Sequence, residues 1–246
     1  MMKVIHSLTN SYSRRRFACL FFSLLLTLVA APVLTALGFS TRSMEVFLAL
    51  NILAAVLITL FSFRSYVGLG LLGLVLATRG GYSLLGYDRL LMTSQGAGVL
   101  TCLVSVLVMF RYILKEGEVN SERIFAALNV YLMIGIMCGL LFFIFEEQWP
   151  GSFSLSGLSF AGSKTIQLAD TLYFSFVTLG TLGYGDITPV GGPARALAVT
   201  EAIVGQMYLV VVVARLVSLY EGSALRAERR QRDKAISVDE DPGRRD

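Results

Sequence analysis

Two glycines, Gly183 and Gly185, alternate with larger residues in the segment TLGYGD at 181–186. Glycine adopts positive φ without the steric penalty of a Cβ atom. When positive φ alternates with ordinary backbone, successive carbonyl groups turn toward the same side of the chain. A run of carbonyl oxygens facing one side can replace the water around a cation. The segment therefore supports cation coordination by backbone oxygens, with the Thr181 hydroxyl below them.

The same glycines have two other interpretations, a plain turn and a phosphate-binding loop. Gly180, Gly183 and Gly185 superficially resemble nucleotide-binding spacings, but a phosphate loop needs a strand before it and a helix directly after it. Residues 170–179 instead predict a short helix before the loop, with Asp170 placed to cap its first turn. Such a helix is about 15 Å long, about half of a bilayer core. Its carbonyl end carries about half a negative charge, which favours a cation at the membrane centre.

The composition is that of a membrane protein, with 55% hydrophobic and 15% charged residues. The net charge of +4 comes largely from the two ends, 14–16 and 226–234, which indicates membrane topology and lipid as a partner rather than nucleic acid. The cysteines Cys19, Cys102 and Cys138 lie in apolar segments without metal-ligand spacing. We expect no disulfide framework, no cysteine-held metal and no cofactor.

Long apolar segments predict an all-α membrane protein: six transmembrane helices, with a re-entrant pore helix and loop between the fifth and the sixth. The predicted spans are 17–39, 44–63, 66–78, 90–112, 124–145 and 196–220. The third is short for a bilayer and must tilt, extend past Arg79 or thin the membrane. The predicted parts are an N-terminal segment (1–16), an uncharged four-helix bundle (17–115), a pore module (124–220) and a short charged tail (221–246).

Basic residues fall unevenly on the two sides of this arrangement. The side that bears the amino terminus collects Lys3, the arginines at 14–16, Arg64 and the basic residues at 111–123, together with the carboxyl-terminal cluster. Because basic residues accumulate in cytoplasmic loops, both termini are expected in the cytoplasm. We expect a multi-pass protein of a prokaryotic plasma membrane. If 66–78 did not span, either the amino terminus or the loop at 181–186 would lie on the wrong side.

The TLGYGD segment resembles the selectivity filter of potassium channels, and 124–220 looks like the pore module of the tetrameric potassium channel family. The resemblance implies that backbone carbonyls at 181–184, which are those of Thr181, Leu182, Gly183 and Tyr184, bind K⁺ in a homotetramer. It implies support for this filter from Gly185, Asp186, Tyr173 and Phe174, with the Tyr184 ring packed against the two pore-helix aromatics.

Three residues depart from the commonest pattern of this family. Leu182 replaces the usual valine, Gly180 stands where threonine is usual, and Val177 occupies a position where some members have a glutamate paired with the filter aspartate. Asp186 therefore needs another partner or water. These departures bear on the rigidity of the filter more than on the identity of the ion.

Two residues of the sixth span, Glu201 and Gly205, are candidates for support and gating. Because a buried ionisable residue is costly in a membrane, Glu201 is interpreted as a brace behind the filter or as a proton sensor. Gly205, twenty residues after Gly185, is either a hinge or a packing glycine.

The function expected from these features is passive, potassium-selective conduction. The alternatives are a weakly selective monovalent cation channel and, less in keeping with a single pore loop, an ion-coupled transporter. An enzyme is not expected, because the sole histidine, His6, lies outside the spans. The fourth span carries no charge between Arg89 and Arg111, so steep voltage gating is not expected.

Overall fold

A computed structural model describes residues 16–29, 73, 88–115, 120–155 and 166–239. The second and third predicted spans, 44–63 and 66–78, lie outside the described residues, as does the first span beyond Val29. The six-span topology therefore stays a prediction.

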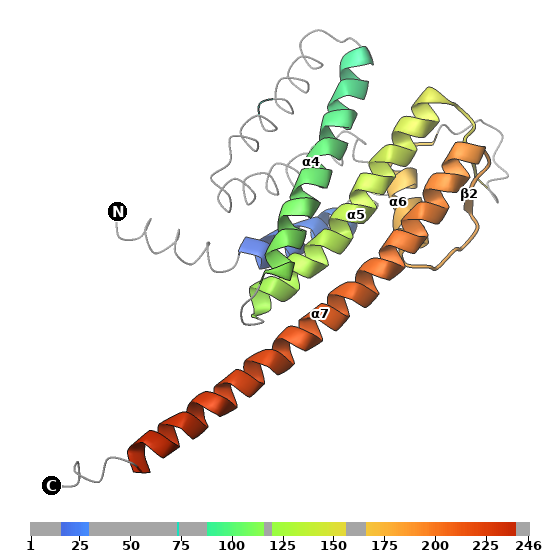
Figure 1. The fold of residues 1–246 in the computed structure, drawn as a ribbon. Coiled ribbons are helices and arrows are strands. Elements are labelled where there is room, and N and C mark those ends of the chain that lie inside the picture. Colours follow the sequence, from blue (N-terminus) through green and yellow to red (C-terminus); the bar gives the residue numbers. More distant parts are fainter. Residues whose placement is uncertain (1–15, 30–72, 74–87, 116–119, 156–165, 240–246) are drawn as a thin grey trace.

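The described part of the chain is mostly helical (Figure 1). Its elements are the helix Arg16–Val29, α4 (Asp88–Leu114), α5 (Ser121–Gln148), β1 (Phe153–Leu155), α6 (Leu168–Leu179), β2 (Ile187–Pro189) and α7 (Gly192–Asp239). Three stretches of these helices are long and apolar enough to cross a membrane: Gln95–Leu114, Ser121–Gln148 and Gly192–Ser218. They correspond to the fourth, fifth and sixth predicted spans.

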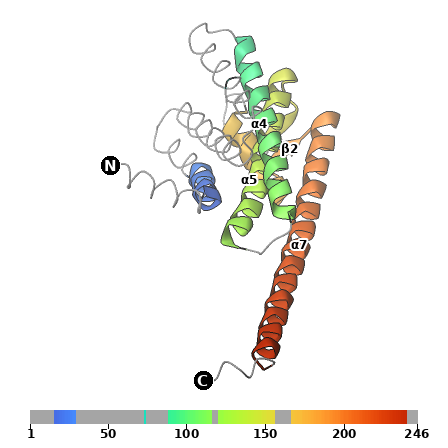
Figure 2. The same cartoon turned by 60° about the vertical axis from the view of Figure 1, so that its left-hand side comes forward.

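The last helix is longer than the sequence analysis expected. The sixth span was predicted to end at Tyr220, but α7 continues to Asp239, and Figure 2 shows this extension projecting well past α4 and α5. Alanine, arginine, glutamate and lysine favour helix, and no proline follows Pro193 until Pro242. The predicted charged tail therefore begins as a continuation of α7.

The central helix of the described chain is α5, which packs against α4, α6 and α7. Its start is capped by Asn120, whose Oδ1 accepts a hydrogen bond from the Arg123 amide at 3.0 Å. A Cβ atom at Gly135 would lie 2.6 Å from Cε1 of Phe176, and one at Gly139 would lie 2.6 Å from Cδ2 of Leu172. These two glycines, one turn apart, let α6 approach the α5 backbone closely.

The amino-terminal helix packs where α4 ends and α5 begins. The Asn129 side chain on α5 donates from Nδ2 to the Phe17 carbonyl at 2.7 Å, and the Phe17 amide donates to Glu122 Oε2 at 3.1 Å. The Phe17 ring lies 5.1 Å from the ring of Tyr112 on α4. The first predicted span thus packs on the same two helices that lead to α6.

A small two-stranded antiparallel sheet joins the segment after α5 to the segment after the glycine loop. Its two strands pair Phe153 with Pro189 and Leu155 with Ile187. Glu146, near the end of α5, accepts hydrogen bonds from the amides of Gly151 and Phe153 at 2.9 and 3.2 Å. The backbone on both sides of α6 is therefore tied together at one end of the molecule.

Candidate ion-coordination site

The loop after α6 has the alternating backbone that the sequence analysis expected. Gly183 and Gly185 have φ of +59° and +78°, which confirms the positive φ predicted for both. Thr181 also has positive φ, +56°, and is the only residue other than glycine with this conformation in the described chain. Because a side chain makes this conformation costly, Thr181 was not predicted to adopt it. Positive φ thus recurs at every second residue of the loop, at 181, 183 and 185.

Hydrogen bonds hold both ends of α6, the helix that precedes this loop. It begins at Leu168, two residues before the predicted start, so Asp170 lies inside the first turn rather than at the cap position. There its Oδ2 accepts a hydrogen bond from the Gln167 amide at 2.9 Å. At the other end the amides of Gly180 and Leu182 donate to the carbonyls of Phe176 and Val177, both at 2.9 Å. The loop therefore starts directly at the carbonyl end of α6, where the helix dipole favours a cation.

Asp186 has the partner that its sequence context left open. The Tyr173 hydroxyl on α6 hydrogen-bonds to the Asp186 carboxylate, and this bond raises the pKa of the Tyr173 phenol from its ordinary value. Asp186 also accepts a hydrogen bond from the Ile187 amide at 3.0 Å. Tyr173 thereby links α6 to the residue that follows the glycines, where Val177 supplies no polar group.

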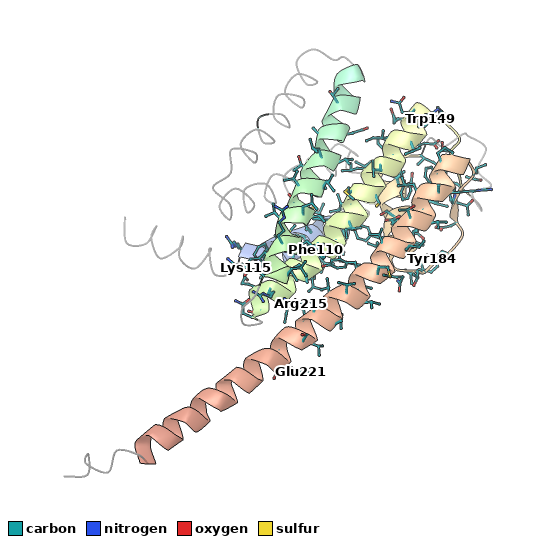
Figure 3. The ribbon with its side chains drawn as sticks, viewed as in Figure 1. Phe110, Lys115, Trp149, Tyr184, Arg215 and Glu221 are labelled. Atoms are coloured by element: carbon teal, nitrogen blue, oxygen red, sulfur yellow. The ribbon has the colours of Figure 1, made fainter. Side chains whose placement is uncertain are left out.

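Phe174, one of the two predicted aromatic supports, packs away from Tyr184. Phe174 is buried and packs on Phe142 of α5 and Phe153 of β1, with ring centroids 5.0 and 5.3 Å apart. The Tyr184 ring is 67% exposed, and Figure 3 shows it at the edge of the chain, on the opposite side of α5 from α4. The expected packing of Tyr184 on Phe174 is therefore not made within the chain.

Glu201 hydrogen-bonds to α6 and not to the glycine loop. It is 2% exposed, and its Oε1 lies 2.5 Å from the hydroxyl oxygen of Ser175 in the middle of α6. Ser175 was not singled out in the sequence, although a hydroxyl in a mostly apolar helix is the kind of group that a buried carboxyl requires. The structure thus connects Glu201 to the loop through α6.

Gly205 packs closely against the last residue of α6. A Cβ atom at Gly205 would lie 2.5 Å from Cδ1 of Leu179 and 3.5 Å from its carbonyl oxygen. That carbonyl also accepts a hydrogen bond from the Tyr131 hydroxyl on α5, at 3.1 Å. Of the two interpretations of Gly205, this geometry favours the packing glycine.

Comparison with known proteins indicates the family to which the chain is similar. A family model described as an ion channel matches residues 130–221, from α5 into α7. Protein LctB of Geobacillus stearothermophilus is 38% identical over 78 residues, 32% of this chain and 58% of that protein. Protein LctB of Bacillus caldotenax is 30% identical over 100 residues, 41% of this chain and 74% of that protein. Two-pore potassium channel 1 of Arabidopsis thaliana is 35% identical over 79 residues, 32% of this chain and 18% of that protein.

The apolar helices and these matches together define a helical membrane protein of the channel class. The chain belongs to the ion-channel family that the model describes. The matched part spans 58% of the first of these relatives and 18% of the plant channel, so the activity of the whole chain is a matter for proposal. No solved structure matches the chain at a comparable level of significance.

Proposed function

We propose that the chain is a subunit of a potassium-selective channel that conducts K⁺ passively, with backbone carbonyls at 181–184 as the ion ligands. The observation that carries this proposal is the positive φ at Thr181, Gly183 and Gly185, in a loop that starts at the carbonyl end of α6. Alternation of this kind turns successive carbonyls to one side, which is the arrangement that replaces the water shell of a cation.

The choice of potassium is supported by the relatives and by the site. Several relatives, among them two-pore potassium channels 1 and 4 of Arabidopsis thaliana, are potassium channels by name. The proposed ligands are neutral carbonyl oxygens, and the first carboxylate after them in the chain, Asp186, is hydrogen-bonded to Tyr173. A neutral ladder suits a monovalent ion, whereas rings of carboxylates serve many other cation channels.

A homotetramer is proposed because one chain supplies only one strand of ligands. Alone, the loop from Gly180 to Asp186 is exposed, with Leu182 58% and Tyr184 67% exposed. One face of α7 is also apolar and exposed, with Val199, Ile203, Met207 and Val210 on it. Copies arranged around an axis along the loop would cover both surfaces and close the ring of oxygens.

The proposed function is tested by ion flux from purified protein in liposomes, first under a potassium gradient and then under a sodium gradient. Fast potassium flux without sodium flux is expected. Comparable sodium flux would favour a weakly selective cation channel, and slow flux that needs a second ion would favour a transporter.

A matched pair of glycine variants ties the flux to the loop. Gly183→Ala places a Cβ at φ +59° with no atom of the same chain within 4 Å, so its cost within the chain is the dihedral alone. Gly191→Ala is the control, because its φ lies outside the positive range and its nearest neighbour, Ser152 Oγ, is 4.0 Å away. Gly183→Ala should abolish selectivity or conduction, whereas Gly191→Ala should keep both. Selective flux retained in Gly183→Ala would refute the proposed ion sites.

A further inference from the structure

Three helices meet at the hydroxyl of Ser175. Its Oγ lies 2.7 Å from the carbonyl oxygen of Gly135 on α5 and 2.5 Å from Oε1 of Glu201 on α7. Ser175 is 0% exposed and Glu201 is 2% exposed, so water does not compete for these bonds. Ser175 and Glu201 thus form a buried polar junction between three helices.

The number of protons available at this junction decides the protonation state of Glu201. A serine hydroxyl has one proton to donate, and the Gly135 carbonyl can only accept. If Ser175 donates to Gly135, the short contact with Glu201 needs a proton from the carboxyl group. If Ser175 donates to an ionised Glu201 instead, the Gly135 oxygen faces a lone pair at 2.7 Å. Only a protonated Glu201 satisfies both contacts.

We propose that Glu201 is a neutral carboxylic acid at neutral pH and donates its proton to Ser175, which in turn donates to Gly135. The inference rests on the proposed function only where it concerns ion flux. In this arrangement Glu201 is a positioning residue, because it acts on the glycine loop through α6.

The described residues around Glu201 include no cation that would stabilise its charge. Its other oxygen, Oε2, is buried without an oxygen or nitrogen donor. Among the described residues, the titratable groups that interact with Glu201 are Cys138 and Tyr131, both on α5. Cys138 supplies only a weak thiol donor, and α6 presents the Ser175 hydroxyl. A buried carboxylate without a cation is costly, so the neutral form also fits the charge balance.

The junction affects the glycine loop through the part of α6 that lies between Ser175 and the loop. Ser175 is one turn before Leu179, whose carbonyl accepts from Tyr131 and whose side chain packs on Gly205. The positive-φ residues begin two residues later, at Thr181. The protonated Glu201 therefore fixes the end of α6 against α5 and α7 at the point where the loop starts.

The protonation state can be read by infrared spectroscopy of the full-length protein in lipid at neutral pH. We expect the carbonyl stretch of a protonated carboxylic acid, lost in Glu201→Gln and kept in Glu221→Gln, which makes the same change at an exposed position of α7. This readout does not depend on ion flux. A wild-type spectrum without a band that Glu201→Gln removes would overturn the proposal, even if the protein conducts potassium.

The positioning role is read from potassium flux and selectivity in liposomes. Glutamine keeps a neutral donor toward Ser175, so Glu201→Gln should stay within about twofold of wild-type flux at neutral pH. Glu201→Ala removes the group that donates to Ser175 and should lower flux or potassium-over-sodium selectivity at least about fivefold. Thr200→Ala is the control, because Thr200 bonds only within its own helix, to Ala196. Loss of flux in Glu201→Gln would overturn the neutral acid as the working form.

Measuring the infrared band and the potassium flux at a series of pH values connects the two experiments. As the pH is raised, wild-type flux should fall over the pH range in which the infrared band of the protonated acid disappears, and should persist at each pH at which that band persists. The flux of Glu201→Gln should not change with pH in this way. Flux that is lost while the band remains, or lost equally in Glu201→Gln, would contradict the inference.

Discussion

The substitution Gly205→Ala distinguishes a hinge in α7 at this glycine from close packing against α6. The added Cβ would lie 2.5 Å from Cδ1 and 3.3 Å from Cγ of Leu179, whereas carbon atoms in contact are about 3.5–4.0 Å apart. The clash therefore amounts to about 1 Å or more. Leu179 is 0% exposed and its carbonyl is held by Tyr131, so the side chain cannot swing into free space. Overpacking of this kind costs about 1–3 kcal/mol.

Reversible unfolding of the purified protein in micelles measures this cost. Gly96→Ala is the matched control, since Gly96 lies inside α4 with no atom within 4 Å of a Cβ. Both variants receive the same gain in helix propensity, up to about 1 kcal/mol. The difference between their unfolding free energies therefore isolates the clash, and Gly205→Ala should be the less stable by about 1–3 kcal/mol.

A double-mutant cycle with Leu179→Ala decides between the two interpretations of Gly205. The single Leu179→Ala change opens a cavity and should cost about 2–5 kcal/mol. The new methyl at 205 would fill part of that cavity, so the double variant should be more stable than the sum of the single effects predicts. Effects that add within about 0.5 kcal/mol, together with an altered open probability, would refute the packing argument and restore the hinge.

Two further predictions concern voltage and the outer end of the loop. Moving one charge across the membrane field is worth about 2.3 kcal/mol per 100 mV, and α4 carries no charged residue between Arg89 and Arg111. Conductance should therefore depend weakly on voltage, and a curve steep enough to require several charges per channel would contradict this. The Tyr173 hydrogen bond to Asp186 raises the pKa of the phenol above the ordinary 10.0. Its contribution to stability is then fully present below pH 10.0 and lost as the pH rises through the raised value. Asp186→Asn should move the phenol titration down toward 10.0, measured by ultraviolet absorbance after subtraction of the Tyr173→Phe curve. An unchanged titration would show that the bond does not form.

Features that depend on local sequence were predictable. Long apolar runs require helices, because every backbone polar group in a membrane must be satisfied within its own segment. The fourth, fifth and sixth spans were therefore located to within a few residues, apart from the extension of α7. The positive φ at Gly183 and Gly185 was also predictable from local sequence, because it depends on the absence of a Cβ atom at these two residues.

Other local features gave too weak a signal. The strands β1 and β2 have three residues each, too few for alternation to be read. The glycines Gly135 and Gly139 have the spacing of small residues at helix contacts, but the spacing does not name the partner helix. The positive φ at Thr181 opposes its own side chain, so only the surrounding structure accounts for it.

The sequence by itself determined which segments are apolar helices and that Gly183 and Gly185 turn with positive φ, because both features depend on the local residue types. It could also mark Glu201 as costly, but not say what the carboxyl meets. Only the tertiary structure brought Glu201, Ser175 and Gly135 together from three helices, and placed Phe174 on α5 instead of on Tyr184. Helical periodicity gives the face on which a side chain lies. The residue opposite that face depends on how the helices pack, which no single segment contains.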